Sequence, residues 1–219
     1  MRTATEEKTK TGEVATMPFD PMPEVIAAIG RGEMVIVTDD EQRENEGDLV
    51  CAAELISPEQ VNFMARFGRG LICVAMQRDR LSALDIRPVR KRGSRDHFNT
   101  AFMESVDARA GITTGISAAD RARTIQLLVD ESTEADDLVS PGHIFPLEAM
   151  PAGVLDRTGH TEAAVDLATL SGLKPVGVIC EIIRDDGHMA RLPDLMRFAA
   201  EHKLKMTSVA DLVRWRQTH

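Results

Sequence analysis

Short apolar runs place the strongest constraint on how this chain folds. Leu71–Met76 has no polar interruption, which predicts a strand covered on both faces. Val176–Ile183 predicts a second buried strand, and Met34–Val37 predicts a core strand. Leu49–Ala53 could form a strand that lies next to that core strand. Runs of this length are typical of a sheet between covering layers rather than of a helical bundle.

Capping and turn residues predict where the helices begin and end. Ser57 stands as N-cap before Pro58, with Gln60 three residues after the cap. Ser117 and Asp120 repeat the N-cap spacing. Further strands and loops are predicted at Ala101–Val106 (strand), Gln77–Asn99 (basic and irregular) and Ser140–Leu147 (loop). The predicted helices are Pro23–Ile29, Pro58–Phe67, Ala118–Val129, Ala163–Leu170, Pro193–His202 and Ser208–Trp215.

Composition narrows the class of protein. A chain of 219 residues that is 43% hydrophobic can bury a real core, so we expect one domain over residues 18–219 after a disordered tail at 1–17. A net charge of −9 argues against a nucleic-acid binder or a binder of anionic membranes. No apolar run reaches the roughly 18 residues that span a bilayer, and a soluble, cytoplasmic protein is expected. The three cysteines lie in apolar runs without metal-site spacing, which predicts buried thiols.

The stretch Asp39–Asp48 concentrates charge between two predicted strands. Six carboxylates accompany a single base, Arg43. Crowded carboxylates repel one another unless a cation or backbone donors offset them. The stretch is therefore either a solvated acidic turn or a site for a hard divalent ion such as Mg²⁺. An EF-hand is excluded because Gln42 would have to be its first ligand.

Two further segments carry groups suited to chemistry. Arg157–Thr161 combines an arginine that can grip phosphate, a histidine that can bind a metal, and a helix start with a threonine N-cap. Glu181 lies inside a buried strand, so it is either paired or functional. His143 lies in a predicted loop, where a lone histidine is usually a surface residue. Gly111–Ser117 precedes a helix and is a weak candidate for anion binding.

These segments occur in a fixed order that resembles one enzyme family. The order is the acidic turn, GITTGISAADRARTI, SPGHIFPL, RTGHTEAAVDLA and GVICEI. From about Pro23 to Arg216 the chain resembles 3,4-dihydroxy-2-butanone 4-phosphate synthase. The resemblance implies an α+β fold, a three-layer α/β/α sandwich around a mixed β-sheet. It also implies a Mg²⁺-dependent homodimer, with Mn²⁺ as an alternative ion and active sites near the subunit interface.

The same resemblance implies a reaction and a set of site residues. The reaction converts the small-molecule sugar phosphate D-ribulose 5-phosphate into L-3,4-dihydroxy-2-butanone 4-phosphate and formate, in riboflavin biosynthesis. Glu44 and His160 would bind the metal, and His143, Glu181 and Asp48 would transfer protons. The residues expected at the substrate are Arg43, Glu44, Asp48, Arg157, Thr158, Gly159, His160, Thr161 and Glu181.

Two other hypotheses about the function of this chain stay open at this point. A non-catalytic binding protein on the same fold would keep Arg157 and Thr161 and lose the groups that transfer protons. Glu44, His143, His160 and Glu181 together argue against this reading. A structural protein with an acidic surface would bind no magnesium and would leave both histidine motifs without a role.

Overall fold

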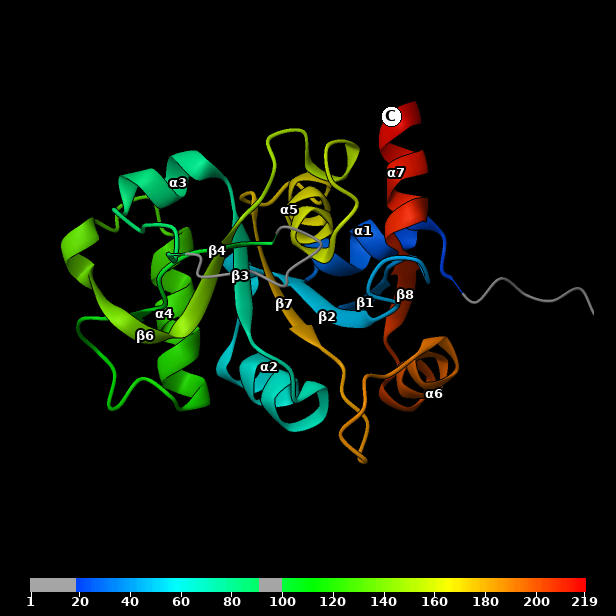
Figure 1. The fold of residues 1–219 in the computed structure, drawn as a ribbon, viewed down its shortest axis with the longest axis horizontal. Helices are drawn as coiled ribbons and strands as arrows, with labels where there is room; N and C mark the ends of the chain where they lie inside the picture. The colour runs from blue at the N-terminus through cyan, green and yellow to red at the C-terminus, as the bar shows by residue number, and fades with distance from the viewer. Residues whose placement is uncertain (1–18, 91–99) are drawn as a thin grey trace, which may run out of the picture.

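A mixed sheet of eight strands forms the centre of the computed structural model, which describes residues 19–90 and 100–219 (Figure 1). The tail expected at 1–17 lies outside the described residues. The strand order is β4-β6-β3-β7-β2-β1-β8, and β5 pairs with β6 beside this path. The strands are β1 Val35–Thr38, β2 Gly47–Ala52, β3 Cys73–Met76, β4 Ala101–Phe102, β5 Val106–Ala108, β6 Leu138–Glu148, β7 Val176–Glu181 and β8 Lys205–Ser208.

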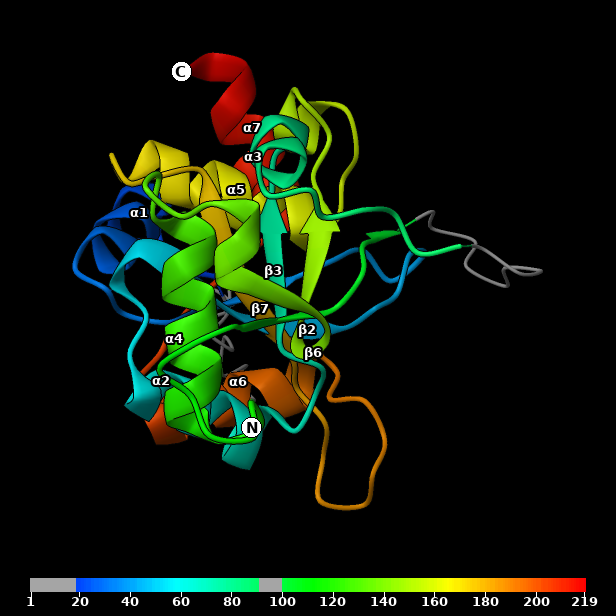
Figure 2. The ribbon, with the colours of Figure 1, turned by 90° about the vertical axis from the view of Figure 1, so that its left-hand side faces the viewer.

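Helices cover both faces of this sheet (Figure 1). Helices α1, α5 and α7 pack on one face, and α2, α4 and α6 pack on the other. Figure 2 faces the end of the molecule where α4 lies next to α2. The helices are α1 Met22–Gly30, α2 Pro58–Phe63, α3 Arg78–Ala83, α4 Ala118–Val129, α5 His160–Leu170, α6 Leu192–His202 and α7 Val209–Thr218. The predicted three-layer α+β sandwich is therefore confirmed.

The alternation of side chains explains why the strands read as continuous apolar runs. In β2, Leu49 and Cys51 face the layer of α2, α4 and α6, whereas Val50 and Ala52 face the layer of α1, α5 and α7. Successive side chains point to opposite faces, and both faces are dry. Each fully buried Val, Leu or Ile then contributes roughly 1.5–3 kcal/mol. A polar side chain in such a strand is tolerated only where the covering helices leave a cavity beside the sheet.

Several predicted boundaries are wrong. The predicted loop Ser140–Leu147 lies inside β6, where the register with β5 shifts from Ile144 to Val139. A bulge of this kind tolerates proline, because no ladder bond is lost there. The predicted strand Ala101–Val106 is divided between β4 and the start of β5. Short α3 occupies part of a segment predicted to be irregular, and β8 was missed.

The pairing of β2 determines where the acidic stretch lies. β1 and β2 form an antiparallel hairpin, so residues 39–46 are its turn, while Gly47 and Asp48 already belong to β2. On its other side β2 pairs with β7, which sets Asp48 opposite Glu181.

Within the described ranges, every helix is too short or too polar to cross a bilayer.

Candidate active site

A cavity of about 300 Å³ lies where β2, β3 and β7 meet the start of α5. Most of the predicted site residues lie around it: Arg43, Glu44, Asp48, Arg157, His160, Thr161 and Glu181. Glu46, Cys73, Thr100, Phe102, Leu147 and Ile179 complete its wall. Sequence reasoning missed these wall residues, because an apolar strand residue such as Cys73 carries no local sign of what it faces.

Two carboxylates are placed side by side by strand register. Asp48 pairs with Glu181 across the β2–β7 ladder, and both alternate onto the face that α5 covers. The Leu71 N–H donates to Glu181 Oε2 at 2.8 Å. A Cβ on Gly70 would lie 2.4 Å from that same oxygen, so only glycine leaves room for it. The backbone of 70–71 therefore holds Glu181 in one orientation.

The acidic turn is organised by Asp39. Its carboxylate accepts the N–H groups of Glu44 at 3.0 Å and Glu46 at 2.8 Å, and it pairs with Arg43 at 2.8 Å. Arg191, which precedes α6, donates to the carbonyls of Glu44 and Asn45. The turn is thus tied down at both ends, and Glu44 is aimed at the cavity. The sequence left Asp39 with no assigned role, since bracing depends on the shape of the turn.

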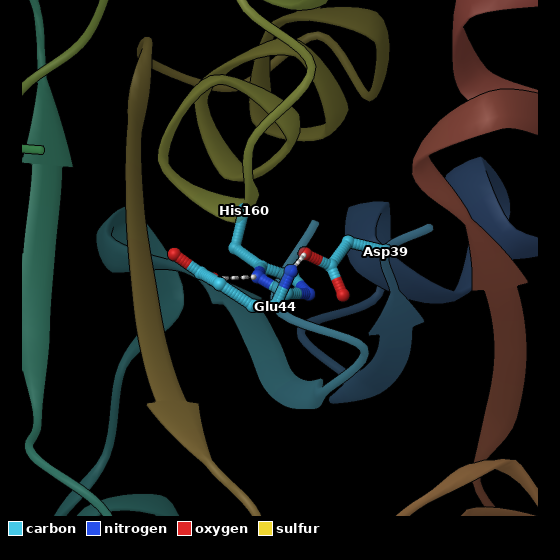
Figure 3. A group of neighbouring side chains, drawn as sticks. All are labelled: Asp39, Glu44 and His160. Carbon is cyan, nitrogen blue, oxygen red and sulfur yellow. Dashed lines mark hydrogen bonds and ion pairs between the residues drawn. The ribbon is translucent and has the colours of Figure 1, made fainter. Parts of the chain in front are cut away.

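His160 lies among carboxylates at the first position of α5 (Figure 3). Its Nδ1 is 3.6 Å from Glu44 Oε2 and 3.9 Å from Asp48 Oδ1. Burial by itself would lower the pKa of His160, but the charges of Asp48, Glu44 and Asp39 outweigh it and raise the pKa to about 9. Burial, with smaller contributions from Glu181 and Glu44, raises the pKa of Asp48 to about 7.

This group of residues fits a divalent ion. Ligand atoms of Asp39, Glu44 and His160 lie within 4.8 Å of one another. Among the residues that the structure describes, buried Asp48 Oδ1 and His160 Nε2 have no hydrogen-bond partner. Buried polar atoms without partners are costly, and a metal with its waters would satisfy them. Asp39 is already used by the turn, which leaves Glu44 and His160 as the better direct ligands.

Two arginines lie beside the start of α5. Arg157 donates to Glu162 at 2.6 Å and to Thr100 at 3.0 Å. A Cβ on Gly159 would lie 2.3 Å from Arg157 Nη1 and 3.0 Å from Arg43 Nη2, so glycine lets two guanidinium groups approach the same backbone. Helix N-termini and arginine forks both favour phosphate.

The start of α5 differs from the prediction. The helix begins at His160 rather than Ala163, and its N-cap is Gly159 without a side-chain cap, not a threonine. Thr161 is buried in the cavity wall. Thr158 instead lines a separate cavity of about 630 Å³ between the acidic turn and α6–α7. That cavity is the larger one, but the carboxylates paired across the sheet and the arginine Arg157 gather at the smaller one.

His143 does not line the cavity with the other predicted residues. It lies in β6, where its Nδ1 is 2.6 Å from Asp107 Oδ2 and its side chain is 41% exposed. The structure therefore divides the predicted site into two parts, a buried charged cavity and an exposed histidine–aspartate pair.

Comparisons with known proteins agree with these observations. A sequence model of the family 3,4-dihydroxy-2-butanone 4-phosphate synthase matches residues 23–215. A 3,4-dihydroxy-2-butanone 4-phosphate synthase of Agrobacterium fabrum is 54% identical over 199 residues, which cover 91% of this chain and 93% of that protein. The riboflavin biosynthesis protein RibBA of Aquifex aeolicus is 54% identical over 200 residues, 90% of this chain. This chain spans about half of that relative's length (49%) and of other curated relatives that it matches.

A solved structure shows the same architecture. It is a 3,4-dihydroxy-2-butanone 4-phosphate synthase in complex with two magnesium ions. It superimposes with a TM-score of 0.87 at 40% identity, covering 91% of this chain and 98% of that one.

Proposed function

The chain belongs to the 3,4-dihydroxy-2-butanone 4-phosphate synthase family, and on that premise we propose that it converts D-ribulose 5-phosphate into L-3,4-dihydroxy-2-butanone 4-phosphate and formate. The active domain would be residues 18–219, and the reaction would supply riboflavin biosynthesis. One observation carries this proposal: a single cavity joins a candidate metal site, two carboxylates paired across the sheet and an arginine beside a helix N-terminus.

Substrate binding would use the residues that line the cavity. Arg157, Thr161 and the N-terminus of α5 would hold the phosphate, with Gly159 giving the backbone access. Arg43 and Asp48 would contact the sugar.

Glu44 and His160 would hold Mg²⁺, with Mn²⁺ as the alternative ion. Bound there, a divalent ion stabilises negative charge on sugar oxygens as an enediol forms. His160 must give up its proton to act as a ligand, because only the neutral ring coordinates.

Proton transfer would involve Asp48 and Glu181. A proton must leave the carbon next to the carbonyl before dehydration and rearrangement can follow. Asp48 has a pKa near 7, so it can both accept and return a proton around neutral pH. Glu181, paired opposite it, is the second carboxylate within reach. All atoms of the substrate are found in the two products, so no external oxidant or reductant is needed.

The direct test is formate production from ribulose 5-phosphate, with Mg²⁺ and after chelation. We expect formate only with the ion. Glu44→Gln should abolish Mg²⁺ binding and formate production, whereas Glu41→Gln removes one exposed charge from the same turn and should keep both. Absence of Mg²⁺-dependent formate from well-folded wild-type protein would refute the proposal.

We further propose that the active unit is a homodimer in which His143 of one copy reaches the cavity of the other. Two observations support this. His143 is half-exposed and lies outside the cavity wall. Exposed apolar side chains also occur in both regions: Leu71 at 39% and Phe102 at 41% beside the cavity, and Ile116 at 55% beside the histidine. Contact between such patches of two copies would bury them.

Mixing two inactive variants tests this arrangement. A dimer of one His143→Ala chain and one Glu44→Gln chain contains one cavity with intact Glu44 that faces an intact partner histidine. Random mixing should restore about a quarter of wild-type activity, because half the dimers are mixed and each has one working site. If His143 acted within its own chain, every site would carry a defect, and mixing would restore nothing.

A further inference from the structure

A buried carboxylate on the neighbouring strand holds His143. Asp107 of β5 receives the His143 backbone N–H on Oδ1 at 2.9 Å, and its Oδ2 lies 2.6 Å from His143 Nδ1. The Asp107 side chain is 8% exposed, while the His143 ring is 41% exposed. His143 therefore contacts both oxygens of the buried Asp107 carboxylate, and the rest of its ring is exposed to solvent.

The surrounding backbone is shaped to keep this pair together. A Cβ on Gly115 would lie 2.2 Å from Asp107 Oδ2 and 2.6 Å from His143 Nδ1. Gly115 also has a φ of +93°, which side chains rarely allow. A Cβ on Gly142 would lie 2.0 Å from the carbonyl carbon of Val106, so β6 comes this close to β5 only with glycine there.

The loop that carries Gly115 is itself anchored. Asp120, near the start of α4, accepts the Thr113 N–H at 3.1 Å, the Thr113 hydroxyl at 2.7 Å and the Gly115 N–H at 3.1 Å. These bonds lower the pKa of Asp120, the Thr113 hydroxyl contributing most, so it stays ionised. Gly115 is therefore held against the Asp107–His143 pair from outside.

A carboxylate acceptor determines which ring nitrogen carries the hydrogen. With Asp107 Oδ2 at Nδ1, the neutral ring must be protonated on Nδ1, and its lone pair lies on Nε2. Across the described ranges, no protein group forms a hydrogen bond with Nε2 of His143. The atom able to exchange a proton is therefore the one that points away from Asp107.

We propose that Asp107 is a positioning residue, which fixes the tautomer and the orientation of His143 so that Nε2 performs the proton transfer. The statement about rate rests on the function proposed above, whereas the statement about the tautomer does not. Asp107 does not line the cavity, so we expect its effect to pass through His143. Histidine–carboxylate pairs act this way in other enzymes, where the carboxylate orients the ring without itself changing protonation.

The first test measures the tautomer directly. Nitrogen NMR of protein labelled with ¹⁵N-histidine, at alkaline pH, separates protonated from unprotonated nitrogens of neutral histidine rings. The His143→Ala variant identifies the His143 signals. We expect protonated Nδ1 and unprotonated Nε2 in the wild type, and the reverse in Asp107→Asn, whose amide N–H would donate to Nδ1. Protonated Nε2 in the wild type would overturn the proposal, even if the protein produced no formate.

The second test measures the rate. Asp107→Asn should lower kcat by about 10²-fold, within the range for loss of a correctly placed acid or base. KM for ribulose 5-phosphate and affinity for Mg²⁺ should change less than about twofold, since Asp107 lies outside the cavity. Asp136→Asn is the matched control, because it removes an exposed carboxylate just before β6, the strand that carries His143. Wild-type kcat in Asp107→Asn, or a fall in kcat with an unchanged tautomer, would overturn the proposal.

Discussion

The cavity and the Asp107–His143 pair contain the same kinds of groups but satisfy them in opposite ways. In the cavity, Asp48 Oδ1 and His160 Nε2 are buried with no hydrogen-bond partner in the described part of the chain. In the pair, both oxygens of Asp107 meet hydrogen-bonding groups of His143. On the proposed function an ion and substrate would complete the cavity, whereas the hydrogen bonds of the pair are already made within the chain.

The pKa values follow the same division. Burial raises the pKa of Asp48 to about 7, while the surrounding carboxylates outweigh burial and raise the pKa of His160 to about 9. Such shifts come from burial and from unbalanced charge, and a cation would remove the imbalance. Buried polar atoms without partners therefore mark the region that we propose to bind ligands, and a fully hydrogen-bonded carboxylate marks the region that we propose to transfer a proton.

The largest expected effect is loss of turnover when either region loses its proton-transfer group. Glu181→Gln and His143→Ala should each lower kcat by about 10²–10⁴-fold, as expected for removal of a general acid or base. The folded state should survive, by circular dichroism and melting temperature. Glu148→Gln changes a carboxylate at the end of β6 and should keep its rate. Near-normal rates for His143→Ala would show that only the cavity takes part in the reaction.

A glycine substitution tests the preformed geometry of the pair. Gly115→Ala should lower kcat at least tenfold, because its Cβ would collide with Asp107 and His143. Gly172→Ala is the matched control, with a φ of +76° and no atom within 4 Å of the added Cβ. Both variants carry backbone strain of about 1–3 kcal/mol, so both should melt earlier, but only Gly115→Ala should slow catalysis. Equal kcat values for Gly115→Ala and Gly172→Ala would contradict the predicted collision.

Metal binding should depend on pH through His160. Its folded pKa of about 9 lies above the ordinary value of 6.5, so its ion pairs stabilise the metal-free protein below pH 6.5 and lose this effect as pH rises through 9. An ion that needs the neutral ring must displace that proton. Mg²⁺ affinity should thus rise up to tenfold per pH unit between pH 7 and 9 and then level off.

Calorimetry in two buffers with different ionisation enthalpies counts the protons released on binding. We expect about one proton per ion near pH 8, both in the wild type and in His143→Ala. Affinity that is independent of pH would show that His160 is not a ligand.

The smallest expected effect concerns stability. The pKa of Asp48 is raised in the folded state, so its charge opposes folding at neutral pH, and acidification through pH 7 relieves this cost. Asp48→Asn should therefore stabilise the metal-free protein by about 1 kcal/mol, less than the full shift because His160 loses an ion pair. Its turnover should fall. Asp186→Asn is the control, because it removes an exposed carboxylate whose pKa is lowered, mainly by the His188 N–H, and it should not stabilise the protein. A loss of stability in Asp48→Asn measured by urea unfolding would contradict this reading.

Local pattern was enough to predict much of this protein. The apolar runs at Leu71–Met76 and Val176–Ile183 correspond to β3 and β7, and the caps at Ser57 and Ser117 are present with their side-chain bonds. These features depend on neighbours in the chain, which the sequence displays directly. The three cysteines are buried and free, as expected. Most of the residues that the family resemblance named line the cavity.

Other features were decided only by the tertiary structure. β6 reads as a loop because Pro141 and Gly142 occupy a bulge that exists only when β5 lies beside it. Asp48 meets Glu181 because β2 pairs with β7, whose residues lie more than a hundred positions away. Asp107 had no sequence signal, because its partner His143 is brought to it by the pairing of β5 with β6. The role of Asp39 depends on the shape of the turn that it braces. Residue types and local order therefore determined the possible chemistry, and strand register determined which groups meet.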